Sequence, residues 1–152
     1  MKNKFVRIHA ILSSVIYSNR DIVSVVDIPE DLIYTENHEW LQVIDRVAYI
    51  GLSEYARDAL GEIVFVEMLE PGDKVSKGDE ILNIESTKVA QGLIAPLSGI
   101  IVDVNEDLKE EPERINSDPL GNFIYSIQIS DAKELDSHMN AEQYRKFISG
   151  PD

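Results

Sequence analysis

Short apolar segments alternate with tight turns through most of this chain, and this alternation limits the folds open to it. Turn-forming residues such as Pro71, at the second position of a turn, separate the segments. The succession of strand, turn and strand in residues 63–86 recurs more weakly in residues 99–130, where the polar residues 107–118 form a loop. Two similar halves predict two small antiparallel sheets that face each other. The segments with the character of strands are 47–51, 63–69, 80–85, 92–95, 100–104 and 122–129.

Short helices are expected beside these strands. Ser53 can cap a helix over Glu54–Leu60, and Gly61 can end it, because glycine readily adopts the left-handed conformation after a helix. Two further pairs have the spacing of capping boxes and predict short C-terminal helices. These pairs are Asp131 with Glu134 and Asn140 with Gln143. We therefore expect an all-β fold with short helices, in the form of a flattened barrel of two facing sheets.

Composition excludes several classes of function. The chain has 152 residues, the size of one domain, and a formal net charge of −14, which disfavours nucleic acid as the main partner. It has no cysteine, so disulfides, thiolate nucleophiles and sulfur-based metal sites are absent. The three histidines, His9, His38 and His138, have no metal-binding spacing. No apolar run approaches the length of a membrane span.

The first twenty residues differ in charge from the rest. They hold four basic residues and no acidic one, and Phe5, Ile8 and Leu12 share one side of a helical wheel. A basic, serine-containing, amphipathic start is typical of an organelle transit peptide and predicts a mitochondrial matrix protein. The alternative is an N-terminal arm on a protein of the bacterial cytoplasm. In either case we divide the chain into an arm, residues 1–27, and a domain, residues 28–152.

One lysine lies where the two halves of the pattern meet. Residues 85–90 read Glu-Ser-Thr-Lys-Val-Ala and stand between apolar segments, so they should form the exposed tip of a hairpin. A lysine on an exposed turn ordinarily contributes only a hydrated charge to the protein surface. Here the residues Ala95-Pro96-Leu97-Ser98-Gly99 follow Lys88 at a short distance, and the combination is more specific than a lone lysine.

The surroundings of Lys88 resemble the lipoyl-lysine site of swinging-arm carrier proteins. Biotin carriers place methionine on both sides of their lysine, where this chain has Thr87 and Val89. Lipoyl domains of 2-oxo acid dehydrogenase complexes usually read Glu-Thr-Asp-Lys. Over about residues 28–148 the chain more closely resembles the H protein of the glycine cleavage system. The residues that carry this resemblance are Tyr34-Thr35, His38-Glu39-Trp40, Gly51-Leu52-Ser53, 60–66, Pro71-Gly72, Gly78, Glu85-Ser86, Lys88, Val104-Asn105, Ile115-Asn116, Asp118-Pro119, Leu135 and Tyr144.

The resemblance implies roles for three residues. Lys88 would carry lipoate as an amide, and Glu85, three residues earlier, would be recognised by the attaching enzyme, unless it is only a solvated strand residue. Glu39 would hold the loaded arm from a partly exposed position, because a carboxylate favours the cationic aminomethyl group that this family carries. The alternative for Glu39 is a salt bridge or an exposed acid. His38 and Trp40 are expected to pack and to form hydrogen bonds.

The resemblance also implies a fold of the lipoyl and biotinyl type and a carrier that is not an enzyme by itself. Its cofactor would be lipoate. Its partners would be glycine decarboxylase, the aminomethyltransferase, dihydrolipoamide dehydrogenase, and a lipoate ligase or lipoyl transferase. The carrier would be a monomer with no metal, nucleic acid or membrane partner. No acid–base dyad, nucleophile or phosphate loop points to independent catalysis.

Three departures from the family keep a second function open. Val89 follows the lysine where alanine is common, Gly92 stands where a polar residue is common, and Asn122 replaces a tryptophan. The alternative is an H-like carrier that relays lipoate to other lipoyl proteins or serves thiol and disulfide oxidation.

Overall fold

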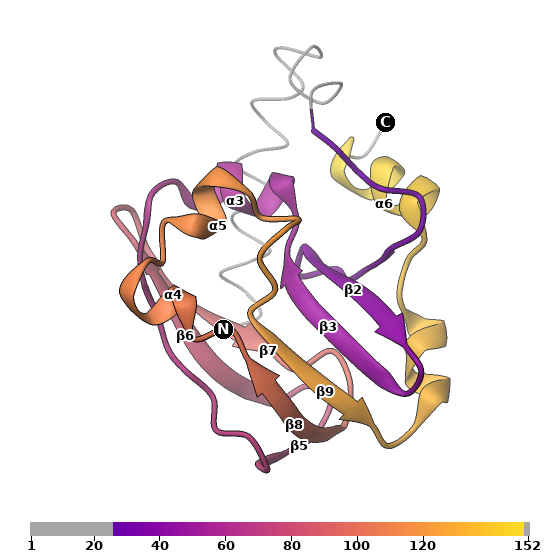
Figure 1. The fold of residues 1–152 in the computed structure, drawn as a ribbon. Coiled ribbons are helices and arrows are strands. Elements are labelled where there is room, and N and C mark those ends of the chain that lie inside the picture. Colours follow the sequence, from indigo (N-terminus) through magenta and orange to yellow (C-terminus); the bar gives the residue numbers. More distant parts are fainter. Residues whose placement is uncertain (1–25, 151–152) are drawn as a thin grey trace.

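Two antiparallel sheets face each other in the computed structural model, which describes residues 26–150 (Figure 1). The larger sheet has the order β1-β2-β3-β9-β8-β5, and the smaller one has the order β4-β6-β7. The strands of the larger sheet are β1 (Ile33–Tyr34), β2 (Glu39–Ile44), β3 (Val47–Leu52), β5 (Lys74–Val75), β8 (Gly99–Val104) and β9 (Tyr125–Ile129). Those of the smaller sheet are β4 (Ile63–Val66), β6 (Glu80–Ser86) and β7 (Ala90–Ile94). The predicted fold of facing antiparallel sheets with short helices is confirmed, although the sheets do not close into a barrel.

The main core lies between the sheets. Strand residues alternate between the two faces of a sheet, so inward positions are apolar and their neighbours are exposed. On β6, for example, Leu82 and Ile84 are buried while Asn83 and Glu85 are exposed. The other large buried residues of this core include Leu41, Ile50, Leu52, Leu60, Ile63, Leu93, Ile101 and Ile127.

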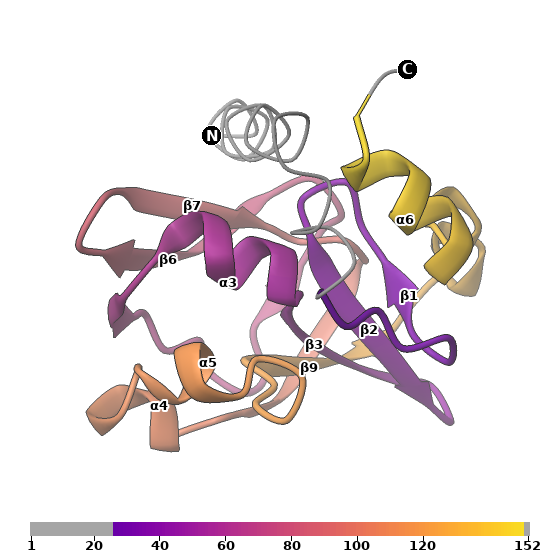
Figure 2. The same cartoon turned by 90° about the horizontal axis from the view of Figure 1, so that it is seen from above.

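The helix α3 (Glu54–Leu60) forms as the sequence predicts. The Ser53 hydroxyl accepts a hydrogen bond from the Ala56 amide at 3.1 Å, which caps the first turn. Gly61 follows the helix with φ of 78°, a conformation that favours glycine. The helix packs beside the hairpin of β6 and β7 at one end of the molecule, and α6 (Ala141–Ile148) lies at the other (Figure 2).

A second core joins α6 to the edge of the larger sheet. Tyr144 of α6 stacks on Tyr34 of β1 with ring centroids 4.6 Å apart. Trp40 packs over Gly51, where a β-carbon would lie 2.5 Å from the indole ring, so a glycine is needed at this position. The predicted capping box of α6 is confirmed, since Asn140 and Gln143 exchange hydrogen bonds.

The other predicted capping box is wrong. Asp131 accepts a hydrogen bond from the Lys133 amide and begins the 3-10 helix η1 (Ala132–Ser137). The Glu134 carboxylate does not return to Asp131, because it accepts hydrogen bonds from the amide and the hydroxyl of Ser98. It therefore fastens η1 to the turn before β8.

Several boundaries also differ from the sequence prediction. The strand expected over residues 63–69 ends at Val66, and the last strand begins at Tyr125. The expected loop over residues 107–118 contains two one-turn helices, α4 (Asp107–Glu110) and α5 (Arg114–Ser117). The predicted arm falls almost wholly in residues 1–25, outside the described part. Among residues 26–150 no helix is long and apolar enough to cross a membrane.

Candidate functional site

Lys88 lies on the exposed tip of the β6–β7 hairpin, as the sequence predicts. Ser86 organises this tip. Its hydroxyl accepts hydrogen bonds from the amides of Lys88 and Val89, at 3.2 and 3.1 Å. Its own amide donates to the Val89 carbonyl at 2.8 Å. The turn is therefore held by its own residues, and the lysine side chain projects from a defined position.

The tip rests on the corner between α3 and β4. The Thr87 amide donates a hydrogen bond to the Glu62 carbonyl at 3.0 Å. The Lys88 side chain crosses Gly61, with Cε only 3.1 Å from the point that a β-carbon on Gly61 would occupy. A larger residue at position 61 would displace the lysine. Gly61 therefore provides a flat seat for the side chain that the sequence singles out.

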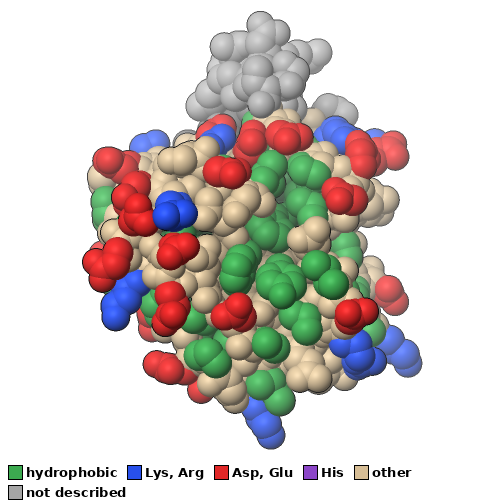
Figure 3. Space-filling view, in the orientation of Figure 1, with side chains coloured by type: hydrophobic (Ala, Val, Ile, Leu, Met, Phe, Trp, Pro, Cys, Tyr) green, Lys and Arg blue, Asp and Glu red, His purple; other side chains and the backbone are tan. Residues whose placement is uncertain are grey.

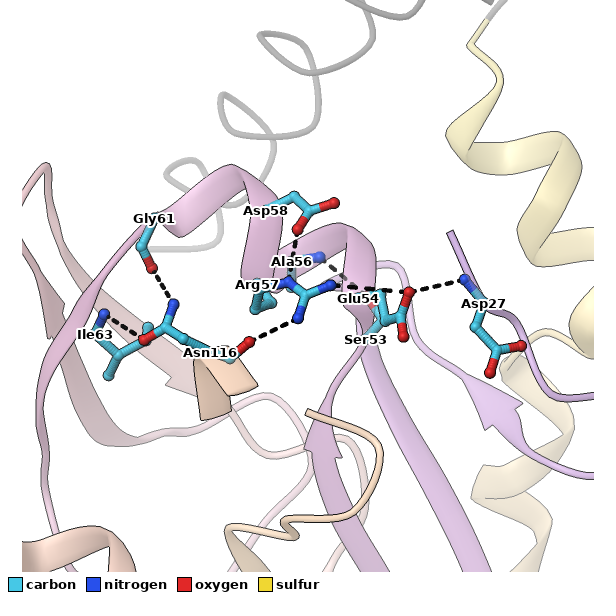
Figure 4. A network of polar contacts seen from close by, with 9 residues as sticks. All are labelled: Asp27, Ser53, Glu54, Ala56, Arg57, Asp58, Gly61, Ile63 and Asn116. Carbon is cyan, nitrogen blue, oxygen red and sulfur yellow. Dashed lines mark hydrogen bonds and ion pairs between the residues drawn. The ribbon is translucent and has the colours of Figure 1, made fainter. Parts of the chain in front are cut away.

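Asn116 of α5 fixes this corner (Figure 4). Its amide nitrogen donates to the Gly61 carbonyl at 2.7 Å, and its amide oxygen accepts from the Ile63 amide at 2.9 Å. The two bonds fix the residues on either side of Glu62, whose carbonyl accepts the hydrogen bond from Thr87 of the hairpin tip. Arg57 of α3 adds a third link, because its guanidinium donates to the Asn116 carbonyl at 2.7 Å.

Glu85 lies on the outer face of the smaller sheet. It pairs with Phe65 on β4 and with Ala90 on β7, and its side chain is exposed. Within residues 26–150 its carboxylate makes no hydrogen bond or ion pair, so it is available to an approaching protein. The structure thus brings Glu85 and Lys88 to the same end of one hairpin.

Glu39 is wholly buried, so the expectation that it lies partly exposed is wrong. One carboxylate oxygen, Oε1, accepts a hydrogen bond from the Thr35 hydroxyl at 3.1 Å. The other, Oε2, has no hydrogen-bond partner among the described residues. Burial raises the pKa of Glu39 to about 8, against a smaller lowering by the Thr35 hydrogen bond.

The two neighbours of Glu39 have the structural roles expected of them. The His38 ring is within hydrogen-bonding distance of the Tyr144 hydroxyl, at 2.9 Å, and the Trp40 indole donates to the Pro119 carbonyl at 3.0 Å. Together they tie the start of β2 to α6 and to the segment before β9.

The structure does not bring Glu39 into contact with Lys88. Glu39 pairs with Leu52, immediately before α3, whereas Lys88 lies over Gly61, immediately after it. The helix α3, seven residues and about 10 Å long, lies between Leu52 and Gly61 in the chain. A cavity of about 510 Å³ is lined in part by Thr35, the residue whose hydroxyl donates to Glu39. Its lining includes Thr35, Asn37, Ile94, Pro96, Met139 and Phe147.

Sequence reasoning missed three residues of this site. Gly61 was predicted to end a helix but not to seat Lys88, Asn116 had no predicted contact, and Thr35 had no predicted link to Glu39. These roles depend on contacts between residues that are distant in sequence or on different elements, which local patterns do not report.

Known proteins match nearly the whole described region. A family model described as "Glycine cleavage H-protein" matches residues 32–150. A glycine cleavage system H protein of Alcanivorax borkumensis is 44% identical over 123 residues, which cover 80% of this chain and 96% of the relative. One of Clostridioides difficile is 48% identical over 115 residues, which cover 75% and 92%. The crystal structure of a glycine cleavage system H protein from Mycobacterium marinum aligns with a TM-score of 0.72 and 37% identity, covering 78% of this chain and 97% of that one.

Proposed function

Since this chain belongs to the glycine cleavage H-protein family, we propose that it carries lipoate on Lys88 and transports the aminomethyl group of glycine. The observation that carries the proposal is the position of Lys88 on a rigid, exposed hairpin tip over Gly61. A lysine held there can be reached by an attaching enzyme and then by several partners in turn.

The residues around Lys88 fit a lipoyl group. The amine is on an exposed residue, the turn around it is fixed by Ser86, and the seat on Gly61 has no side chain to obstruct an extended arm. The chain has no cysteine of its own, and a bound lipoyl group supplies the dithiolane sulfurs that accept the aminomethyl group.

We further propose that Glu39 stabilises the loaded arm. Its Oε2 is a buried polar atom without a partner among the described residues, and such an atom gains from pairing with a cation. Thr35 donates a hydrogen bond to the other oxygen, and it also lines the neighbouring cavity. A ligand in that cavity would therefore contact the residue that is bonded to the carboxylate. The ionised form of Glu39 would attract the ammonium, and the raised pKa makes that form scarce below neutral pH.

The partners proposed for this carrier are the other components of the glycine cleavage system. Glycine decarboxylase would load the arm, the aminomethyltransferase would unload it, and dihydrolipoamide dehydrogenase would reoxidise it. A lipoate ligase or lipoyl transferase would install the cofactor. In this scheme the carrier holds and presents the group, and the partner enzymes supply the catalysis. The relatives described above are bacterial and give no support to the mitochondrial matrix, so we propose a bacterial setting.

The test combines attachment with transfer. The wild-type protein, incubated with a lipoate ligase, ATP and lipoate, should gain one lipoyl group, and peptide mapping should place it on Lys88. Lys88→Arg should gain none and should not accept the aminomethyl group, whereas Lys74→Arg, on exposed β5, should behave as wild type. Attachment elsewhere would refute the assignment of Lys88. A lipoylated wild type that accepts no aminomethyl group from glycine decarboxylase would refute the glycine cleavage function instead.

A further inference from the structure

A β-bulge turns two consecutive apolar side chains of β4 outward. Ile63 pairs with Ser86 and Phe65 pairs with Glu85, so Val64 is the extra residue of the ladder. The bulge breaks the usual alternation, since Val64 and Phe65 are 51% and 46% exposed between buried neighbours. About half of each apolar side chain stays in water on an edge strand, and bulges are over-represented beside functional sites, where they redirect side chains.

These side chains lie next to the modification site. Phe65 is beside Glu85 in the outer row of the smaller sheet, and Val89, the residue after Lys88, is 39% exposed at the hairpin tip. We name Val64, Phe65, Val89 and Glu85 the bulge surface. Acidic residues border it, because Glu62 and Glu67 flank β4 and both are exposed.

We propose that the bulge surface is the docking site for the enzyme that attaches lipoate to Lys88, an inference that rests on the proposed function. The partner surface that fits it is an apolar recess for Phe65 with basic residues at its border. The apolar contact would supply affinity, and the carboxylates would orient the partner and speed its approach.

The chemistry of attachment favours the attaching enzyme over the other enzymes that act at Lys88 as the partner of this surface. The neutral Nζ attacks the carbonyl carbon of an activated lipoyl group, such as a lipoyl adenylate. The amide C–N bond forms, and the bond from the carbonyl carbon to the phosphate oxygen breaks. The nucleotide leaves with that electron pair, and the proton of the amine passes to a base or to water.

The distance of the reacting atom from the backbone distinguishes lipoate attachment from the later steps of loading, unloading and reoxidation. The attacking atom lies only one lysine side chain from the backbone, so the enzyme must close over the hairpin tip and touch what surrounds it. The later partners act at the dithiolane, whose attachment roughly doubles the reach of the arm. They can work without covering β4. The bulge surface should therefore affect attachment much more than use of the finished arm.

The structure offers a matched control. Val102 on β8 is also an outward valine at a bulge and is 45% exposed, but it belongs to the larger sheet. The outer face of that sheet has its own gathering of hydrophobic side chains (Figure 3). Val64→Ser and Val102→Ser thus make the same chemical change at bulged positions of similar exposure, and only the first lies on a strand of the sheet that carries Lys88.

The experiment measures lipoate attachment by a purified ligase as a function of carrier concentration. Phe65→Ala should raise KM about tenfold and Val64→Ser about threefold, with kcat changed less than twofold, because they weaken docking and leave the amine in place. Val102→Ser should match wild type. Each variant is then lipoylated to completion, as judged by intact mass, and its loading by glycine decarboxylase should equal that of wild type.

Three results would overturn the inference. An unchanged KM for Phe65→Ala and Val64→Ser would show that attachment does not use this surface. An equal loss of loading by glycine decarboxylase would show that the surface is not particular to the attaching enzyme. Failure of the wild type to accept lipoate would remove the proposed function together with the inference, whereas the first two results leave that function standing.

Discussion

The side chain of Lys88 lies across Gly61, with Nζ 3.5 Å and Cε 3.1 Å from the point that a β-carbon on Gly61 would occupy. Two features favour glycine at position 61. One is the contact with Lys88, and the other is a φ of 78°, which disfavours any residue with a side chain. Gly61 thus both ends α3 and lies under the side chain of Lys88. The way in which α3 ends therefore affects the orientation of the Lys88 amine.

Gly61→Ala should slow lipoate attachment, and Gly78→Ala should not. Both glycines have positive φ, so both alanine variants should lose roughly 1–3 kcal/mol of stability to backbone strain. Only at Gly61 would the new methyl group meet Lys88, since nothing lies within 4 Å of a β-carbon at Gly78. Attachment kinetics and urea unfolding of the two variants separate the effects. Equal attachment rates at similar stability would show that the seat does not matter.

Asn116→Ala should destabilise the corner on which the hairpin tip rests. The variant loses the bonds to the Gly61 carbonyl and the Ile63 amide, each worth about 1 kcal/mol, so we expect a loss of about 2 kcal/mol. Asn122→Ala is the control, because its two bonds are exposed and should contribute less. The free energy of unfolding in urea measures both. A loss for Asn116→Ala no larger than that for Asn122→Ala would contradict the anchoring role.

Signals that are local in sequence predicted the structure well. Ser53, Gly61 and the turn residues around Lys88 act on their own neighbours, so the helix over Glu54–Leu60 and the hairpin could both be predicted. The strand β2 was missed because its residues do not alternate. The first three residues are buried and the last three exposed, because Trp40 packs into the second core and Leu41 into the main core, while the end of the strand is open to solvent.

Tertiary contacts account for the rest of what the sequence could not reveal. The acidic segment after β8 folds into helices of four residues each, too short for a periodic pattern. A glutamate beside a tryptophan gives no sign that it will be fully buried, as Glu39 is. The exposed hairpin tip that carries Lys88 could be predicted because its motif is contiguous. The contacts of Asn116 and Thr35 could not, because they form only when distant or separate elements come together.

A chain that begins at Val26 should fold and work as the full chain does. The basic residues 1–20 precede the region that matches the family, and the truncated chain keeps Asp27, whose amide donates to the Glu54 carboxylate at 2.9 Å. We expect its free energy of unfolding to change by less than about 1 kcal/mol. Urea unfolding and lipoate attachment test this. A larger loss would show that the N-terminal segment contributes to the folded domain.

Glu39 should make the stability of the protein fall as pH rises above 5. Its pKa is about 8 in the folded protein and near 4.5 when unfolded, so the folded state binds the extra proton between these values. Stability from this group is complete below pH 4.5 and is lost as pH rises toward 8. In Glu39→Gln the loss is absent, and the variant should gain about 3 kcal/mol on wild type between pH 5 and pH 8. Urea unfolding at several pH values measures the difference. Glu70→Gln makes the same change at an exposed acid and serves as the control.

The same carboxylate should protect the loaded arm, and more strongly at higher pH. Only ionised Glu39 can pair with the ammonium of the aminomethyl group, and burial keeps Glu39 mostly protonated below pH 8. At pH 8 we expect Glu39→Gln to lose the aminomethyl group about 2- to 12-fold faster than wild type, the equivalent of about 0.5–1.5 kcal/mol. At pH 6 the two rates should converge, because the cost of ionising Glu39 cancels the pairing. The measurement is the half-life of the loaded carrier without partner enzymes, with Glu70→Gln, at an exposed acid outside the cavity lining, as control. Equal half-lives at pH 8 would leave Glu39 with a structural role alone, in which its bond to Thr35 supports the turn before β2.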